Sequence, residues 1–436
     1  MKDSLTQKLT RYSKTKIPFH MPGHKRVFKN SPIPYHIDIT EVDGFDNLHD
    51  PSGVIKETAD LAKELYSSVE AYPLVGGSTC GILAGIYSLT RDNKNILIAR
   101  NCHKSVYNAA EILDLNVHYV LPEMYDNGIW GAVSAEKIEE LIKLNNIGTI
   151  VITSPTYDGV ISDIPAVFEV CKRNGAYLLV DCAHGAHLFD LHKICDICVM
   201  SLHKTLPSLT QTAVLNVFSD RVDTALVRHG LSIFETSSPS YILLASIDEC
   251  LRYMLDSRDA CSKLLNNLEV FYEKTKTLKN LIVTHFDDPG KIIIFTHDSK
   301  SLEDLLSEEK IEIEMSSTNY VLLIATVCDT KRTLNTLLSA LIKIDKKIGG
   351  KHEKKEREFV LPKKALSVKD AILKSGELRD IHDSLGKISS EYVWAYPPGA
   401  PVLVPGEVIT KEVVDYLDGI EDLKSTKGKY PKIYTL

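Results

Sequence analysis

Three segments in the first half of the chain carry side chains suited to holding and activating a small cofactor. The first is VGGSTCGILAGIYSL (75–89), in which Ser78 and Thr79 fall at the start of a helical apolar pattern. Unpaired backbone N–H groups, the helix dipole and two hydroxyls at such a position favour a phosphate. An ordinary helix N-cap after a glycine turn is the alternative. The segment lacks G-x-x-x-x-G-K-[ST], which excludes a nucleoside-triphosphate P-loop.

The second and third segments place an acid and a lysine after apolar strands. Asp181 ends AYLLVD (176–181), where a carboxylate can hold a ring nitrogen of a cofactor in its protonated form. A turn or N-cap aspartate is the alternative. Lys204 lies in VMSLHKTLPSLTQTAVL (199–215) beside His203. A lysine at a strand exit suits Schiff-base chemistry, because desolvation and nearby cations lower its amine pKa. A surface lysine is the alternative.

Together these segments offer a phosphate cradle, a pyridinium partner and an aldehyde-bonding lysine, which are the three anchors that pyridoxal phosphate needs. His103 in RNCHKSVYNAAE (100–111) follows another predicted strand, where an imidazole could stack on a flat ring. A helix-start histidine is the alternative reading of that residue.

A competing pattern for metal is found in DCAHGAHLFDLHKICDIC (181–198), which contains Cys195-x-x-Cys198. Such spacing is typical of zinc sites. However, Cys198 falls inside an apolar strand pattern and no second C-x-x-C pair exists. Because buried free cysteines are common in protein cores, we predict no metal.

Strand and helix patterns alternate around these residues, which predicts βαβ units and a mostly parallel sheet. Ligands of such sheets bind beyond the carboxyl ends of the strands. Strands are predicted at 95–99, 117–121, 149–153, 176–181, 196–201 and 213–218, and helices at 57–69, 104–114, 134–144 (N-cap Ser134) and 166–174 (ended by Gly175).

The second half of the chain predicts further domains. A long helical pattern at 238–275 leads out of the sheet domain, and 290–296, 301–308, 320–326 and 331–346 alternate as a smaller α/β domain. The basic run 343–359 reads as a solvated linker, with a nucleic-acid tail as the weaker alternative. The predicted division is an N-terminal arm 1–20, a large cofactor-binding domain 21–265, a small α/β domain 266–345, and a linker with a C-terminal domain 346–436.

Composition narrows the class of protein. The 436 residues are 44% hydrophobic and 25% charged, with a net charge of −7, which is ordinary for a globular protein and does not predict a nucleic-acid partner. No apolar run approaches the roughly 20 residues that span a bilayer, and the N-terminus lacks the apolar stretch of a secretory signal. Nine scattered cysteines favour reduced thiols. We therefore expect a cytoplasmic enzyme.

Several segments carry a family resemblance, in chain order FHMPGHK (19–25), DITEVDGFDNLHDPSGVIKE (38–57), RNCHKS, SPTYDGV, VDCAHGAH, SLHKTLPSLTQ, ETSSPSYILLASID (235–248) and AYPPGAPVLVPGE (395–407). The chain resembles the bacterial Orn/Lys/Arg decarboxylases, in a short form without the N-terminal regulatory domain. The resemblance implies pyridoxal phosphate and an aspartate-aminotransferase-like α/β fold (fold type I), with a mostly parallel central sheet, a smaller α/β domain and a C-terminal domain.

The resemblance also implies roles for individual residues. Lys204 would bond to the cofactor aldehyde, Asp181 would pair with the pyridine nitrogen, and His103 would stack on the ring. The residues expected around the phosphate and ring are Ser78, Thr79, Ser201, His203 and His184. Cys182 stands where the family usually has a glutamate, at a position expected to point away from the cofactor.

The implied reaction is decarboxylation of lysine, arginine or ornithine to the corresponding amine, with Lys204 or His203 returning a proton to the α-carbon. Such sites are usually built at a dimer interface, so a homodimer is expected. The distal cation of the substrate needs an acid, for which Glu407, Asp43 and Asp46 are candidates; each could equally be a surface acid. The same fold also permits aminotransfer, β-elimination, cyclisation of a modified arginine, or a non-catalytic paralogue.

Overall fold

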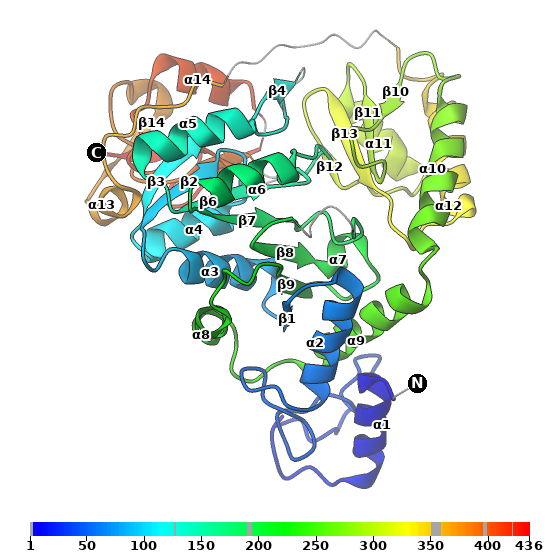
Figure 1. Cartoon of the computed structure of the whole chain (residues 1–436). Coiled ribbons are helices and arrows are strands. Elements are labelled where there is room, and N and C mark those ends of the chain that lie inside the picture. The colour runs from blue at the N-terminus through cyan, green and yellow to red at the C-terminus, as the bar shows by residue number, and fades with distance from the viewer. Residues whose placement is uncertain (1–2, 126–127, 190–193, 350–358, 396–398, 421) are drawn as a thin grey trace. The chain divides into compact units, whose positions relative to one another are not determined.

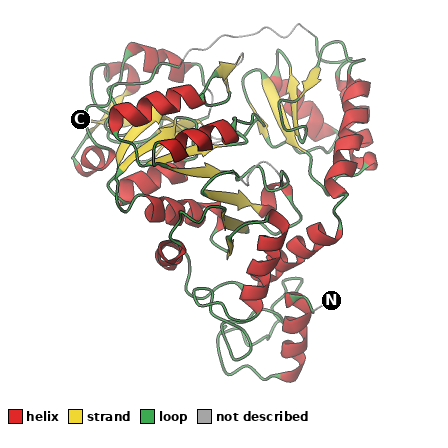
Figure 2. Ribbon diagram, viewed as in Figure 1, coloured by secondary structure: helices red, strands yellow, loops and turns green. Residues whose placement is uncertain are grey.

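A computed structural model describes residues 3–125, 128–189, 194–349, 359–395, 399–420 and 422–436 (Figure 1). The chain forms two compact units, residues 1–91 with 177–261 and residues 92–176 with 262–436. Helices and strands alternate along both units, as the α/β prediction requires (Figure 2).

In the first unit four strands pair in the order β1-β9-β8-β7. The strands β7 and β8 are parallel, whereas β9 runs antiparallel to both β8 and β1. The elements of this unit are α1 (Leu5–Thr15), α2 (Val54–Tyr66), β1 (Glu70–Leu74), α3 (Gly77–Leu89), β7 (Tyr177–Asp181), β8 (Ile197–Ser201), α7 (Leu202–Thr205), β9 (Ala213–Val217), α8 (Thr224–Phe234) and α9 (Tyr241–Asp256).

Register places the functional strand ends of this unit at one edge of the sheet. Leu74 at the end of β1 and Ser201 at the end of β8 both pair with Ala213, the first residue of β9. Asp181 at the end of β7 pairs with Val199 of β8. The loops that leave β1, β7 and β8 therefore all begin at the edge where ligands of α/β sheets bind.

The helix α3 lies close against this sheet because it presents glycine there. A Cβ on Gly81 would lie 2.6 Å from Leu74 Cδ1 and 3.0 Å from Val199 Cγ1, and a Cβ on Gly85 would lie 2.6 Å from Leu179 Cδ1. Such distances are shorter than packed atoms tolerate. The two glycines thus allow the helix to approach the sheet and fix the position of its N-terminus.

In the second unit the parallel strands β6, β2 and β3 pair in that order. A four-stranded antiparallel sheet has the order β10-β11-β13-β12. The elements are β2 (Asn95–Ala99), α4 (Lys104–Ile112), β3 (Asn116–Val120), β4 (Met124–Tyr125), β5 (Ile129–Trp130), α5 (Ala135–Asn145), β6 (Thr149–Thr153), α6 (Ile164–Arg173), α10 (Ala260–Thr275, beginning at the boundary), β10 (Ile282–Thr284), β11 (Lys291–Phe295), α11 (Ser299–Glu308), β12 (Met315–Ser316), β13 (Tyr320–Ile324) and α12 (Lys331–Ile344).

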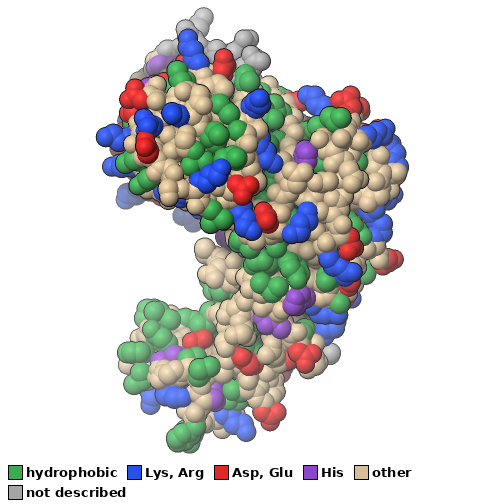
Figure 3. Space-filling view, turned by 90° about the vertical axis from the view of Figure 1, so that its left-hand side faces the viewer, with side chains coloured by type: hydrophobic (Ala, Val, Ile, Leu, Met, Phe, Trp, Pro, Cys, Tyr) green, Lys and Arg blue, Asp and Glu red, His purple; other side chains and the backbone are tan. Residues whose placement is uncertain are grey.

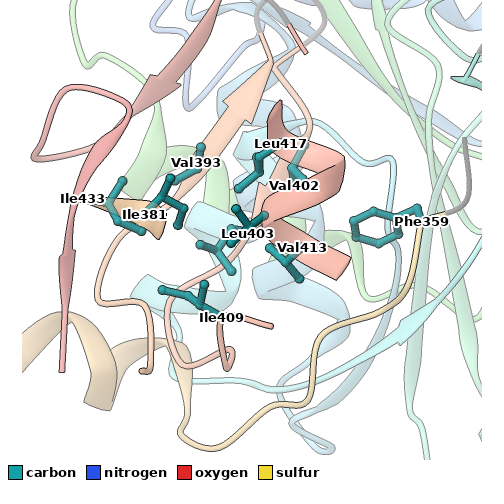
Figure 4. Close-up of a cluster of buried hydrophobic side chains, with 10 residues drawn as sticks. Phe359, Ile381, Val393, Val402, Leu403, Ile409, Val413, Leu417 and Ile433 are labelled. Carbon is teal, nitrogen blue, oxygen red and sulfur yellow. The ribbon is translucent and has the colours of Figure 1, made fainter. Parts of the chain in front are cut away.

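The C-terminal part of the second unit has its own small core, drawn in Figure 4. Buried Val393, Leu403 and Leu417 come from a strand, its neighbour and a helix, and Phe359 joins them from the segment that precedes these elements. The elements here are α13 (Val368–Leu373), β14 (Glu377–Asp380), a 3₁₀ turn (Ile381–Asp383), β15 (Val393–Ala395), β16 (Pro401–Leu403), α14 (Lys411–Asp418), β17 (Leu423–Ser425) and β18 (Lys432–Thr435).

Most predicted elements are confirmed, and three differences have physical reasons. Helix α1 was not predicted, and α2 begins and ends three residues before the predicted 57–69, with the left-handed Ser67 (φ of 57°) as its C-cap. Strand β1 was missed because Pro73 interrupts it; β1 pairs on one side only, where proline is tolerated. The predicted helix 238–275 is broken at 257–259 into α9 and α10.

Two predicted helix ends are confirmed. Ser134 caps α5 by accepting a hydrogen bond from the Lys137 N–H, and Gly175 follows α6 with φ of 69°. The basic run 343–359 lies largely outside the described residues. No helix in the described part of the chain is both long and apolar enough to cross a bilayer.

Candidate active site

The end of β8 presents a lysine to a buried histidine. The short helix α7 follows β8 directly, and within it Lys204 Nζ lies 3.0 Å from His184 Nε2. His184 is buried in the loop after β7. An ammonium can only donate, so the Nε2 atom of His184 accepts, which orients the lysine head group.

Asp181, at the end of β7, supplies the acid of this group. Its carboxylate is buried and accepts a hydrogen bond from the Ala183 N–H at 3.1 Å. Burial raises the pKa of Asp181, and the positive charge of Lys204 partly offsets that rise. A buried carboxylate is suited to accepting a hydrogen bond from a cationic N–H, such as that of a pyridinium ring.

His203 is fixed in one orientation beside Lys204. Its Nδ1 lies 3.0 Å from the carbonyl oxygen of Thr212, at the start of β9. Because a carbonyl only accepts, Nδ1 carries the proton and Nε2 is left as the acceptor of a neutral ring. Burial lowers the pKa of His203, and the Lys204 charge adds to that effect. The imidazole is therefore neutral near pH 7.

The phosphate cradle predicted at Ser78 and Thr79 begins α3. The N-cap is Gly76, which has no side chain to accept from the first turn, so Ser78 and Thr79 are the second and third residues of the helix rather than its cap. Gly77 has φ of 76°, a left-handed value that glycine adopts without strain. The first-turn N–H groups are thus left to an external acceptor.

One polar atom of the same sheet edge lacks a partner in the described part of the chain. Ser201 Oγ is buried at the end of β8, and it makes no hydrogen bond to any described residue. Buried hydroxyls usually have a hydrogen-bond partner in the protein, a water or a ligand. These features fit pyridoxal phosphate. Its phosphate could bind the Ser201 hydroxyl and the uncapped N-terminus of α3, its ring N–H could bind Asp181, and its aldehyde could bond to Lys204.

His103 belongs to the second unit and serves as N-cap of α4. Its Nδ1 accepts from the Ser105 N–H at 3.2 Å, so the neutral ring carries its proton on Nε2. This is the role that the sequence left as the alternative. Stacking of His103 on the cofactor stays a prediction.

The three predicted substrate acids have different surroundings. Asp46 accepts N–H groups of Ser52, Gly53 and Ile55 at 2.7–3.0 Å and so holds the start of α2. Asp43 is exposed, and no hydrogen bond or ion pair of its carboxylate occurs among the described residues.

Glu407 is buried and pairs with a residue that the sequence did not single out. Its Oε2 lies 2.8 Å from Arg100 Nη2 and accepts the Val404 N–H at 2.8 Å. Burial raises the pKa of Glu407, and the Arg100 charge opposes that rise. No local pattern joins two residues 307 positions apart; only their presence in RNCHKS and VPGE hinted at importance.

Seven of the nine cysteines are buried, whereas Cys261 is partly exposed and Cys328 is exposed. Cys182 and Cys198, on β7's exit and on β8, are fully buried neighbours with raised thiol pKa values. All nine cysteines are thiols rather than disulfides. No group of three or more His, Cys, Asp or Glu arranged for a metal occurs among the residues that the structure describes.

Comparison with known proteins identifies the family of the chain. Models of the Orn/Lys/Arg decarboxylase major domain and C-terminal domain match residues 3–286 and 352–431. Arginine decarboxylase of Halalkalibacterium halodurans is 29% identical over 92% of this chain and 89% of that protein.

Solved structures show the same fold. Francisella novicida lysine decarboxylase superposes with a TM-score of 0.84 at 21% identity, covering 99% of this chain and 80% of that one. A variant of serine palmitoyltransferase from S. paucimobilis, with a bound pyridoxal phosphate–myriocin aldimine, reaches a TM-score of 0.54 at 14% identity, over 67% of this chain and 77% of that one. The chain belongs to the Orn/Lys/Arg decarboxylase family, and it is a pyridoxal-phosphate-dependent decarboxylase of a basic amino acid.

Proposed function

We propose that the preferred substrate is arginine and that Lys204, His184, His203 and Asp181 carry the reaction at the ends of β7 and β8. The observation that carries the residue assignment is the Lys204 Nζ–His184 Nε2 contact of 3.0 Å beside the buried Asp181. Arginine is favoured over lysine because relatives named arginine decarboxylase are 29% identical, against 22% for a lysine decarboxylase of Escherichia coli.

These residues would hold the cofactor through its phosphate, its ring nitrogen and its aldehyde. Ser78, Thr79 and the first-turn amides of α3 would bind its phosphate together with Ser201, and Asp181 would accept the ring N–H. Pyridoxal phosphate supplies an electron-accepting ring for the pair released when the carboxylate leaves the α-carbon. The buried negative charge of Asp181 keeps that ring nitrogen protonated, which is the state that accepts electrons.

Proton handling would fall to the residues around Lys204. The lysine must be a neutral amine to attack a carbonyl, and His184 Nε2 is placed to take the proton that Nζ gives up. Lys204, or His203 through its unprotonated Nε2 after uptake of a proton, would return a proton to the α-carbon. His203 can serve because its neutral ring stays correctly oriented by Thr212.

A decisive experiment compares substrates and one variant. Purified protein is incubated with arginine, lysine and ornithine, and the amines and carbon dioxide are measured. We expect agmatine as the main amine, and loss of both products in Lys204→Ala, together with loss of the borohydride-trapped cofactor. Formation of a keto acid without carbon dioxide would refute decarboxylation, and a main amine other than agmatine would refute the arginine preference.

We further propose a cytoplasmic homodimer. Large apolar side chains are exposed on the N-terminal segment, among them Ile17 (84%), Phe19 (95%) and Val27 (65%). An exposed apolar patch of this kind is typical of an interface. Figure 3 shows one face of the molecule, on which hydrophobic side chains lie among acidic and basic ones. Sedimentation should give a mass of twice that of one chain, and Phe19→Ser should lower the measured mass toward that of one chain.

A further inference from the structure

Glu235 holds the loop that leads into the phosphate-binding helix. It is the C-cap of α8, and its N–H donates to Leu231 O at 2.9 Å. Its side chain turns to the loop between β1 and α3, where Oε1 accepts the Val75 N–H at 2.6 Å and the Gly76 N–H at 3.1 Å. One oxygen thus fixes two successive peptide groups, 160 positions away in the sequence.

Gln211 holds the same loop from its other side. Its Nε2 donates to the Val75 carbonyl at 2.7 Å. The loop is also tightly packed, because a Cβ on Gly76 would lie 3.0 Å from Cys80 Sγ and 3.8 Å from Glu235 Oε1. Both polar groups of the Val75 residue are therefore satisfied by side chains from separate segments, which leaves its peptide planes little freedom.

The orientation of these peptide planes decides where the next amides point. Gly77, Ser78 and Thr79 form the first turn of α3, and no side chain caps them. Their N–H groups are the donors that a phosphate would use. The Val75 and Gly76 N–H groups already donate to Glu235, so they are not available to a ligand. The N–H groups that can donate to a phosphate therefore begin at Gly77.

We propose that Glu235 is a positioning residue for the cofactor phosphate: it does not touch the phosphate, but it fixes the Val75–Gly77 loop so that the first amides of α3 face it. This inference rests on the proposed role of Ser78 and Thr79. A carboxylate near a phosphate repels it, so the benefit of Glu235 must come from geometry. Burial raises the pKa of Glu235, and the hydrogen bonds from the Val75 and Gly76 N–H groups oppose that rise.

The test compares pyridoxal phosphate with pyridoxal, which has the same ring and aldehyde but no phosphate. Each is titrated into the cofactor-free full chain, and binding is followed by visible absorbance. We expect Glu235→Ala to raise the Kd of pyridoxal phosphate roughly tenfold or more, since two hydrogen bonds that order the loop are lost. The Kd of pyridoxal should stay unchanged, and Glu235→Gln, which keeps an acceptor oxygen, should stay within about threefold of the parent.

A matched control is Asp298→Ala, which removes an acid that accepts the Ser301 N–H at 2.9 Å at the start of α11; it should leave both Kd values unchanged. Gln211→Ala removes only the opposite hydrogen bond and gives a second test if Glu235→Ala does not fold. If Glu235→Ala binds pyridoxal phosphate with an unchanged Kd, the proposal is overturned. The same result in Gln211→Ala overturns it where Gln211→Ala is the variant used. An equal loss of both ligands, which indicates general damage, overturns it as well.

The double variant Ser78→Ala with Thr79→Ala separates this inference from the cradle itself. If the double variant binds pyridoxal phosphate and pyridoxal with the parent's ratio, the cradle is wrong, and the positioning role falls with it. If the double variant loses the preference for the phosphate while Glu235→Ala keeps it, the cradle stands and only the role of Glu235 is refuted.

Discussion

Replacing Glu407 by glutamine should destabilise the second unit, because it removes the charge that balances a buried guanidinium. The side chains of Arg100 and Glu407 are 0% and 2% exposed, and their Nη2 and Oε2 atoms are 2.8 Å apart. Removing one partner of a buried ion pair typically costs about 3–5 kcal/mol of unfolding free energy.

The surroundings of Arg100 place the expected loss at the lower end of that range. The guanidinium also donates to Val402 O at 2.9 Å and lies over the rings of Tyr119 at 4.7 Å and Phe359 at 5.7 Å. These contacts remain in Glu407→Gln, and the amide keeps an oxygen for the Val404 N–H. We therefore expect a loss of about 3 kcal/mol.

The double variant Arg100→Met with Glu407→Leu isolates the ion pair. Replacing both charges by apolar side chains of similar size is often close to neutral, so the double variant should recover most of the stability lost in Glu407→Gln. Asp60→Asn, in the exposed pair Lys56–Asp60, is the control and should shift stability by no more than about 0.5 kcal/mol.

The assay is urea unfolding followed by circular dichroism, with kcat/KM for arginine and lysine measured on the same samples. Unchanged stability in Glu407→Gln would refute the ion-pair reasoning. The kinetic arm tests the other role predicted for this acid. A substrate-reading Glu407 requires a large fall in kcat/KM, so an unchanged value would remove it from the substrate site.

Other predictions concern single groups of the first unit. Asp46→Ala should lower stability by about 1 kcal/mol, because the hydrogen bonds that hold the start of α2 are lost, and thermal unfolding checks this. Asp43→Asn should leave stability unchanged and raise KM, and an unchanged KM would exclude Asp43 from the substrate site. Burial lowers the pKa of His203 below 6.5, so below about pH 6.5 the unfolded chain binds a proton that the folded chain does not. Stability should therefore fall as the pH falls from about 6.5 toward the lowered pKa, and less steeply in His203→Asn; equal slopes in urea unfolding would contradict this.

The strands of the sheets could be predicted because buried parallel strands are short, continuous apolar runs bounded by turns. The predicted 95–99 and 149–153 coincide with β2 and β6. The edge strand β1 could not be found in this way, because its side chains alternate in burial and Pro73 looks like a strand breaker. The break between α9 and α10 was also missed, since no glycine or proline marks it.

The site was predictable where a residue follows such a strand directly. Asp181 and Lys204 were located in this way, because the end of a buried strand also fixes where the next side chains lie. Glu235 and Arg100 were not, although both stand in family segments. Glu235 acts by accepting distant backbone N–H groups and Arg100 by pairing with a distant acid, and neither interaction leaves a local spacing in the sequence.

The antiparallel strand β9 explains why residues so far apart meet at one edge. Because β9 reverses direction, the chain returns from α7 into the sheet beside β8, and the Leu202 N–H donates to Thr212 O at 3.1 Å. Lys204 therefore lies in the connection 202–212, whose two ends are joined by this hydrogen bond. The same reversal makes β1, antiparallel to β9, run in the direction of β8. The carboxyl end of β1 and the N-terminus of α3 therefore lie at the edge of the sheet that carries the lysine.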